Sequence, residues 1–331
     1  MDLRTTYLGL ELAHPFMPGA SPLVDDLDAV RRLEDAGAAA IVMHSLFEEQ
    51  ITREQLARLR FVDFLDGLSP EARGYLPDPD AFTLGPDAYL DQIRRIKEAV
   101  SVPVIASLNG TTRAGWLDHA RLMEEAGADA LELNVYAVAA DPDVAGEAIE
   151  AETLAMVAAL DARVRIPVAL KVCPFYSSLA HFARRVEAAG AEGLVLFNRL
   201  FQADIDPVAL EVRRVLHLSD SSELPVRLRW LAILSARVGL SLGASGGVHT
   251  ATDAVQALMA GAHGVQMVSA LLKHGPRRLT EVRLGVETWM EEHGYHSLAQ
   301  LRGCMDLSRC PDPAGYERAN YLHLIESWRA S

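Results

Sequence analysis

Four segments of this sequence share one pattern, an amphipathic helix that ends in Ala-Gly-Ala and leads directly into a short apolar strand. The glycines at these junctions are Gly37, Gly127, Gly190 and Gly261. Each lies where a helix commonly ends on a residue with positive φ, which glycine adopts without a steric penalty from Cβ. The strands that follow are mostly apolar, as is typical of strands buried in a parallel sheet. The repeated unit therefore predicts an α/β fold.

Eight strand segments alternate with helical segments along the chain. The strands are expected at 15–17, 41–43, 102–106, 131–133, 166–170, 194–196, 240–243 and 265–267. Helices are expected between them, for example at 25–36, 114–126, 151–162 and 252–259. Eight such units are typical of a (β/α)8 TIM barrel, and a doubly wound open sheet is the alternative. No Gly-x-Gly-x-x-Gly opens the first helix, which disfavours a dinucleotide-binding open sheet. We expect residues 1–331 to form a single barrel domain with a C-terminal helical extension.

Composition narrows the class of ligand. Half of the residues are hydrophobic and 23% are charged, which is too apolar for a disordered chain. The formal net charge of −14 would repel nucleic-acid phosphates and anionic lipid, so small molecules are the expected ligands. The sequence shows neither a signal segment nor a run of about 18 apolar residues, so we expect a cytoplasmic protein without membrane contact.

A metal centre has little support in the sequence. The three cysteines, Cys173, Cys304 and Cys310, are too few and too scattered for a zinc site, an iron–sulfur cluster or a disulfide framework. The eleven histidines show no metal-ligand spacing such as His-Glu-x-x-His.

Two long segments interrupt the alternation of strands and helices. They span residues near 46–90, after the second strand, and near 199–225, after the sixth. Long loops in a compact domain usually have a function. In a barrel they would lie over the C-terminal mouth, where active sites of this fold are found.

Lys171 is the most informative polar residue because it interrupts an apolar strand. Lysine is almost never buried without a charged partner. It is therefore either an exposed strand end, a member of an internal ion pair, a cation beneath a ligand that becomes anionic, or the amine of a Schiff base.

Other polar residues end the remaining strands. They are His44, Ser45, Ser107, Asn134, Asn198 and the segment Ser245-Gly246-Gly247, with Ser269 closing the eighth strand. The amides of Asn134 and Asn198 can both donate and accept, which suits the edge of a heterocycle, and capping of a loop is the alternative role. The glycine pair and Ser269 indicate the phosphate pocket common to many barrels, since closely spaced backbone amides there meet a helix N-terminus.

With these residues in place, the sequence resembles the dihydroorotate dehydrogenase family, class 1 type, over segments from residue 15 to residue 276. The segments that carry the resemblance are Glu132-Leu133-Asn134, Lys171, Asn198, and Gly246-Gly247 with Gln266. The resemblance is closest to a dihydroorotate dehydrogenase-like subgroup in which Ser45-Leu46-Phe47-Glu48-Glu49-Gln50 follows the second strand.

The resemblance implies a flavoprotein that binds FMN at the barrel mouth and oxidises dihydroorotate to orotate in pyrimidine biosynthesis. It implies that Ala20 and Ser21 lie beside the isoalloxazine, that Asn134 and Lys171 reach its pyrimidine edge, and that Gly246, Gly247 and Ser269 hold the phosphate. His44, Ser45, Ser107 and Asn198 complete the expected cofactor set. Lys171, Asn134 and Tyr136 are the expected catalytic residues, because a buried ammonium stabilises the negative charge of reduced flavin.

Departures from the family pattern concentrate on the substrate side. Where the family places a cysteine or serine base, this chain has Ala137, which cannot take a proton. His44 replaces the lysine that follows the second strand. If residues 74–78 correspond to the family's Gly-Leu-Pro-Asn segment, Asp78 replaces an asparagine and is a poor partner for a carboxylated ring. We therefore expect the flavin half of the site to be kept and the substrate to have diverged.

Two alternatives belong to other functional classes. A flavin-free barrel lyase or aldolase would use Lys171 as a Schiff-base amine, and a non-catalytic flavin-binding protein is suggested by Ala137. The expected partners are a small-molecule substrate and either a second copy of the chain or an electron-transfer subunit, and no nucleic acid.

Overall fold

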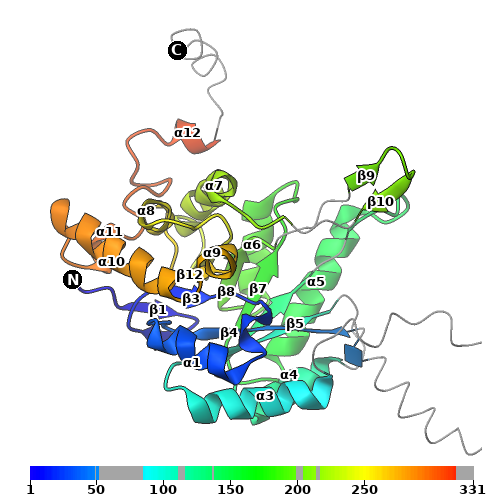
Figure 1. The fold of residues 1–331 in the computed structure, drawn as a ribbon. Helices are drawn as coiled ribbons and strands as arrows, with labels where there is room; N and C mark the ends of the chain where they lie inside the picture. Colours follow the sequence, from blue (N-terminus) through cyan, green and yellow to red (C-terminus); the bar gives the residue numbers. More distant parts are fainter. Residues whose placement is uncertain are drawn as a thin grey trace, which may run out of the picture.

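The computed structural model describes residues 1–48, 50–51, 85–110, 116–135, 138–198, 204–213 and 217–317. An eight-stranded parallel sheet lies at the centre, with helices around it (Figure 1). Its strands are β3 (Phe16–Pro18), β4 (Ile41–Phe47), β5 (Val104–Asn109), β6 (Ala130–Asn134), β7 (Val168–Val172), β8 (Gly193–Leu196), β11 (Ser241–Ser245) and β12 (Gly264–Met267). All eight expected strands are confirmed, with small shifts in their ends.

The order of these strands identifies the architecture. Each strand pairs with its sequence neighbours, in the order β3-β12-β11-β8-β7-β6-β5-β4. The first and last strands also approach each other, since Ala39 N donates to Phe16 O at 3.0 Å just before β4 begins. Sequential order with the two end strands in contact makes a nearly closed barrel. The expected (β/α)8 barrel is therefore confirmed, and the doubly wound open sheet is wrong.

Helices follow most of the barrel strands. They are α1 (Leu27–Asp35), α3 (Pro86–Ala99), α4 (Trp116–Glu125), α5 (Gly146–Asp161), α6 (Leu179–Ala188), α7 (Leu224–Ser235), α8 (Ala251–Met259), α9 (Ser269–His274) and α10 (Arg277–Glu292), with short α11 (Leu298–Leu301) and α12 (Ala314–Glu317) after them. The four junction glycines all have positive φ, between 85° and 114°, as expected. Helix α5 begins five residues before its expected start. Within the described residues, no helix is long and apolar enough to cross a bilayer.

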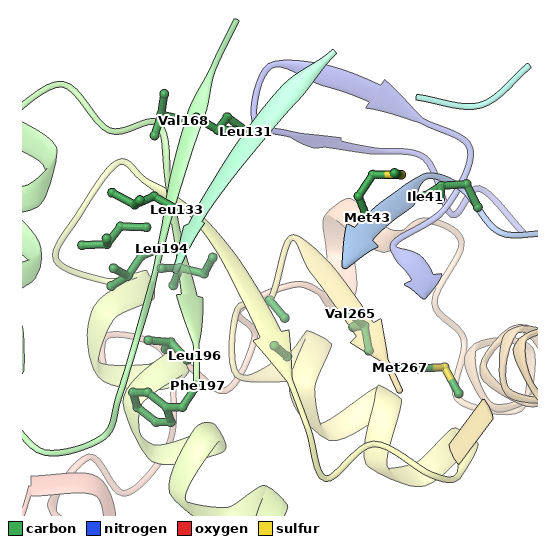
Figure 2. Packing of buried hydrophobic residues seen from close by; sticks show 14 of the residues in the cluster. Ile41, Met43, Leu131, Leu133, Val168, Leu194, Leu196, Phe197, Val265 and Met267 are labelled. Atoms are coloured by element: carbon green, nitrogen blue, oxygen red, sulfur yellow. The ribbon is translucent and has the colours of Figure 1, made fainter. Parts of the chain in front are cut away.

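Strand residues alternate between two apolar layers. One set points outward against the helices, and Figure 2 shows members of it, including Met43, Leu133, Leu196 and Met267. The other set points into the barrel and includes Val42, Ile105, Ala130, Ala169 and Val195. The inward residues are apolar near the N-terminal ends of the strands and polar near their C-terminal ends, where Ser107, Asn134 and Lys171 are buried.

A hairpin closes the N-terminal end of the barrel. Strands β1 (Thr5–Tyr7) and β2 (Leu10–Leu12) pair in antiparallel fashion, and Tyr7 and Leu8 are buried with the inward set. Three strand glycines leave room for them, because a Cβ on Gly193 would lie 2.3 Å from Leu8 and one on Gly243 2.8 Å from Tyr7 Oη, with Gly264 similarly close. This hairpin was not predicted from the sequence. That residues 1–331 form a single domain stays a prediction.

Candidate active site

A cavity of about 410 Å³ opens at the C-terminal mouth of the barrel. Eight of the eleven expected cofactor residues line it: Ala20, Ser21, Ser45, Asn134, Lys171, Asn198, Gly246 and Ser269. These residues come from seven different strands or their following loops. The volume falls within the range of small-molecule sites, which is roughly 300 to 1,000 Å³. The other three expected residues, His44, Ser107 and Gly247, are not part of its lining.

The amide of Asn134 is fixed from behind by two serines. Its Nδ2 donates to Ser45 Oγ at 2.7 Å and to Ser107 Oγ at 2.9 Å, and the two hydroxyls lie 2.8 Å apart. This arrangement uses both amide hydrogens and orients Oδ1 away from the serines. Oδ1 is buried and has no hydrogen-bond partner among the described residues. Ser107 thus serves the site by holding Asn134, although it does not itself line the cavity.

Lys171 belongs to a buried polar network inside the barrel. Its Nζ donates to Glu132 Oε1 and to Gln266 Oε1, both at 3.0 Å, and Gln266 Nε2 donates to Glu132 Oε2. The side chains of Lys171 and Glu132 are 7% and 1% exposed, so each charge depends on the other for compensation. An ammonium has three donors, and these contacts use two of them. Lys171 is therefore both a member of an internal ion pair and part of the cavity wall.

Tyr7 forms the floor beneath this network. Burial and the nearby Glu132 carboxylate raise the pKa of its phenol well above its usual value. The phenol therefore stays neutral, and Lys171 is the charged donor that reaches the cavity from this layer.

A bulge in β4 removes His44 from the inward face. Val42 pairs with Ile105 and Ser45 pairs with Ser107, so two residues of β4 stand opposite one residue of β5. An extra residue of this kind shifts the alternation of side chains by one position. Before the bulge Val42 points inward, whereas after it Ser45 and Phe47 line the cavity.

His44 contacts Asp25 instead of the cavity. Its Nδ1 lies 2.6 Å from Asp25 Oδ1, and its ring meets the edge of Tyr89 with centroids 5.3 Å apart. Burial lowers the pKa of His44 and raises that of Asp25, so desolvation favours the uncharged forms of both groups. The expected contact of His44 with a cofactor stays a prediction, and this geometry gives it no direct route to the cavity.

The two-glycine turn after β11 is held by helix α7. Gly246 and Gly247 have φ of 85° and 81°, which a residue with Cβ rarely adopts. Arg227, buried on α7, donates from Nε to the carbonyl of Ser245 and from Nη1 to the carbonyl of Glu223 at 2.6 Å. A Cβ on Gly246 would lie 2.7 Å from Arg227 Nη2.

The neighbouring backbone, and not the cavity, leaves no room for a side chain at Gly247. A Cβ there would lie 2.7 Å from the backbone nitrogen of Leu224, at the start of α7. From the sequence, glycine at this position is expected to let backbone amides approach a phosphate. The structure gives a different reason for glycine, namely close packing of the turn against a helix.

Ser219 and Ser269 also lie at the C-terminal mouth of the barrel. Ser219 N donates to Ser269 Oγ at 3.0 Å, and Lys273 Nζ donates to the carbonyl of Ser219 at 2.8 Å. Ser219 Oγ lies 3.2 Å from His249 Nε2. Both serines line the cavity, so this end is rich in hydroxyl and amide groups.

Several wall residues escaped the sequence reasoning as site residues. They are Phe47, Phe197, Ser219 and Arg227, which line the cavity, and Glu132 and Gln266, which hold Lys171. Glu132 and Gln266 were noted only for the resemblance, yet each is a polar residue at an inward position of an apolar strand. Arg227 could have been found because it follows Leu224 and precedes Leu231 at helical spacing on the buried face of α7. The expected catalytic Tyr136, and also Ala137 and Asp78, lie outside the described residues.

Comparison with known proteins decides the family. A model of the dihydroorotate dehydrogenase family matches residues 81–290, which is more than half of the chain. The chain belongs to the dihydroorotate dehydrogenase family. This confirms the resemblance inferred from the strand-end residues.

Relatives cover nearly the whole chain. The catalytic subunit of dihydroorotate dehydrogenase B (NAD(+)) from Thermoplasma volcanium is 27% identical over 314 residues, which are 91% of this chain and 98% of the relative. The protein of the same name from Pyrococcus abyssi is 28% identical over 313 residues, with the same coverage. The NAD-dependent dihydropyrimidine dehydrogenase subunit PreA of Escherichia coli is 24% identical over 324 residues, which are 91% of this chain and 76% of the relative. The chain is therefore a dihydroorotate dehydrogenase-like oxidoreductase.

Proposed function

We propose that this protein is an FMN-dependent oxidoreductase acting on a CH–CH bond of a small heterocyclic or carbonyl-bearing substrate that has diverged from dihydroorotate. The observation that carries the proposal is the buried Asn134 amide, presented to the cavity beside the Lys171 ammonium. Both groups suit the polar edge of a flavin ring, and both stand at positions where the family motif matches.

The cavity wall fits such a cofactor on its own chemistry. Ser21 Oγ and Asn134 Oδ1 are buried without hydrogen-bond partners among the described residues, and both residues line the cavity. A buried polar group left unpaired costs roughly 1 to 3 kcal/mol, so a ligand with polar edges at these points would recover that energy. Ala20 and Ser21 would lie beside the ring, and the turn at Gly246 with Ser269 would hold the phosphate end.

The residues of this chain have distinct tasks in that arrangement. Bound FMN would supply hydride acceptance and electron transfer, which no side chain here can provide. Lys171 would offset negative charge on the reduced ring, while Glu132 and Gln266 hold its ammonium in position. Ser45 and Ser107 would fix the direction of the Asn134 amide.

The ion pair argues against the lyase alternative. A Schiff-base amine must lose its proton before it attacks a carbonyl. Glu132, 3.0 Å from Lys171 Nζ, stabilises the protonated ammonium instead. A charged donor fits a flavin site, and an amine nucleophile does not fit this environment.

Dihydroorotate is the substrate that the family resemblance implies, and residues on the substrate side of this chain differ from the family pattern. Ala137 provides no base, and His44, which replaces the family lysine, is turned toward Asp25. Relatives named for dihydroorotate and for dihydropyrimidine both match the chain, so a ring of the dihydropyrimidine type is the substrate class we propose to test first. A role in pyrimidine biosynthesis itself would require that dihydroorotate is accepted.

An electron acceptor outside this chain completes the proposal. All three relatives described above are named as subunits, which supports an electron-transfer partner, and a soluble acceptor is the other option. A cytoplasmic location stays a prediction from the sequence.

The test begins with the purified protein. We expect a flavin absorption spectrum, release of FMN on denaturation, and anaerobic bleaching by dihydrouracil or a related ring. Asn134→Leu should weaken FMN affinity at least about fivefold, since a hydrogen bond in a buried site contributes on the order of 1 kcal/mol or more. His44→Gln, outside the cavity, should change it by no more than about twofold. A protein that takes up no FMN after reconstitution would refute the proposal.

A further inference from the structure

Asn109 is a residue of the cavity wall that the proposed cofactor arrangement does not use. It ends β5, lines the cavity and is partly buried. Its side-chain amide forms no hydrogen bond with any residue in the part of the chain that the structure describes. A carboxamide carries two N–H donors and an oxygen that accepts. The donors and the acceptor of Asn109 are therefore available to a ligand in the cavity.

The strand order places Asn109 across the barrel from the proposed phosphate end. In the ring of eight strands, β5 lies four strands from β11 in either direction. The Gly246 turn follows β11, and Ser269 comes shortly after β12. A cofactor whose phosphate is held there extends toward the ends of β4, β5 and β6. A substrate has to meet the reactive ring of that cofactor on this side of the cavity.

Two neighbours of Asn109 shape this side of the wall. In the register of the sheet, Asn109 stands beside Phe47 on β4 and beside Asn134 on β6. Phe47 lines the cavity and is 39% exposed, although it is a large aromatic residue. A flat ring packed against Phe47 would remove apolar surface of both partners from water. The wall here therefore combines an aromatic side chain with an adjacent carboxamide.

The hydrogen-bonding pattern of a carboxamide selects its ligand. Its N–H and its C=O lie in one plane, and together they pair with a group that holds an acceptor beside a donor, as asparagine does with adenine. A cyclic amide has this pattern, because the ring keeps its N–H and its C=O on the same side. A cyclic ketone or ester has no N–H and satisfies only half of the pattern.

We propose that Asn109 is a specificity-determining residue, which pairs with the N–H and C=O of a cyclic-amide substrate while Phe47 packs against the plane of the same ring. This inference rests on the proposed function, because it assigns the substrate side of that cavity. It narrows the substrate class from heterocyclic or carbonyl-bearing molecules to rings that contain an amide.

Binding of uracil to the FMN-loaded protein tests the inference, with 1,3-dimethyluracil as the matched probe. The two rings carry the same C=O groups, and methyl groups replace both N–H donors in the second. In calorimetry, the wild type should bind uracil at least about fivefold more tightly than 1,3-dimethyluracil. In Asn109→Leu, the Kd for uracil should rise at least about fivefold, while the Kd for 1,3-dimethyluracil should change by no more than about twofold.

Phe47→Leu is the control variant, because it removes the aromatic ring and keeps the Asn109 amide. It should weaken binding of both probes by a similar factor, so that the preference for uracil persists. Both variants should bind FMN within about twofold of the wild type, since neither side chain is assigned to the cofactor. Asn109→Leu should also keep the Tm of the wild type, because no hydrogen bond to a described residue is lost.

FMN binding is measured first, so that the two proposals can fail separately. A chain that takes up no FMN refutes the proposed function and this inference with it. A flavoprotein that binds neither probe, or binds both equally, overturns the inference and leaves the proposed function standing. An Asn109→Leu variant whose affinity for the two probes changes by the same factor does so as well.

Discussion

Removing the Lys171 ammonium should destabilise the protein because the Glu132 carboxylate is then buried without its cationic partner. In Lys171→Met, the Glu132 carboxylate, whose side chain is 1% exposed, keeps only the amide of Gln266 as a described partner. Breaking a buried ion pair on one side costs about 3 to 5 kcal/mol. At roughly 2 to 4 °C per kcal/mol for chains somewhat shorter than this one, the Tm should fall by roughly 5 to 15 °C.

The double variant separates this cost from lost packing. Lys171→Met/Glu132→Gln removes both charges and should recover most of the loss, to within about 1 to 2 kcal/mol of the wild type. Lys97→Met is the matched control, because Lys97 pairs with Asp129 where both side chains are about 30% exposed, and such a pair contributes at most about 1 kcal/mol.

The assay is urea and thermal unfolding of the flavin-free protein, so that cofactor affinity does not contribute to stability. Reconstitution with FMN then reports the functional role separately, since both Lys171→Met variants should bind flavin weakly or lower its reduction potential. If the single variant is as stable as the wild type, or the double variant is no more stable than the single one, the inferred dependence of Glu132 on Lys171 is wrong.

Three further predictions concern other parts of the molecule. Gly247→Val should abolish FMN retention and lower the yield of folded protein, because its side chain would meet the backbone of Leu224; full FMN occupancy would contradict this. Burial lowers the pKa of His14 to about 4, and its Nδ1 accepts a hydrogen bond from Phe16 N, so the folded state binds fewer protons than the unfolded state. This group should therefore lower the free energy of unfolding by roughly 3 kcal/mol as the pH drops from about 6.5 to about 4. In urea unfolding, His14→Gln should lose this pH dependence. Dihydroorotate should reduce the flavin at least about a hundredfold more slowly than is expected of the family, because Ala137 supplies no base, and Ala137→Cys should restore this only in part; rapid single-turnover reduction by the unmodified protein would show that the substrate side was misread.

Local pattern was enough to predict the barrel. Each junction glycine, such as Gly127, reports a helix end through its own backbone, and the strand after it is apolar over its whole length. These signals need no knowledge of distant residues. Lys171 and Asn134 lie at the ends of two of these strands, and polar residues at such ends lie at the C-terminal mouth of a barrel. For this reason most of the expected site residues line the cavity.

Features that depend on contacts between distant segments were not predictable in this way. The pairing of Lys171 with Glu132 and Gln266 joins three strands, and no spacing in the sequence reveals it. The buried hairpin at Tyr7 depends on glycines in three other strands. The orientation of His44 toward Asp25 depends on the bulge where β4 meets β5, which its position in the sequence does not reveal.

Because of the bulge in β4, simple alternation along the chain does not predict which side chains of this strand point into the barrel. A substitution at residue 44 changes the environment of Asp25 and leaves the cavity lining unchanged. Deleting one residue, Met43 or His44, would remove the bulge and keep Ser45 inward opposite Ser107, because Val42 and Ser45 already lie on the same face of the strand. The extra residue therefore gives β4 one more position that faces away from the cavity, and His44 uses it to contact Asp25 while Ser45 keeps its place in the cavity wall.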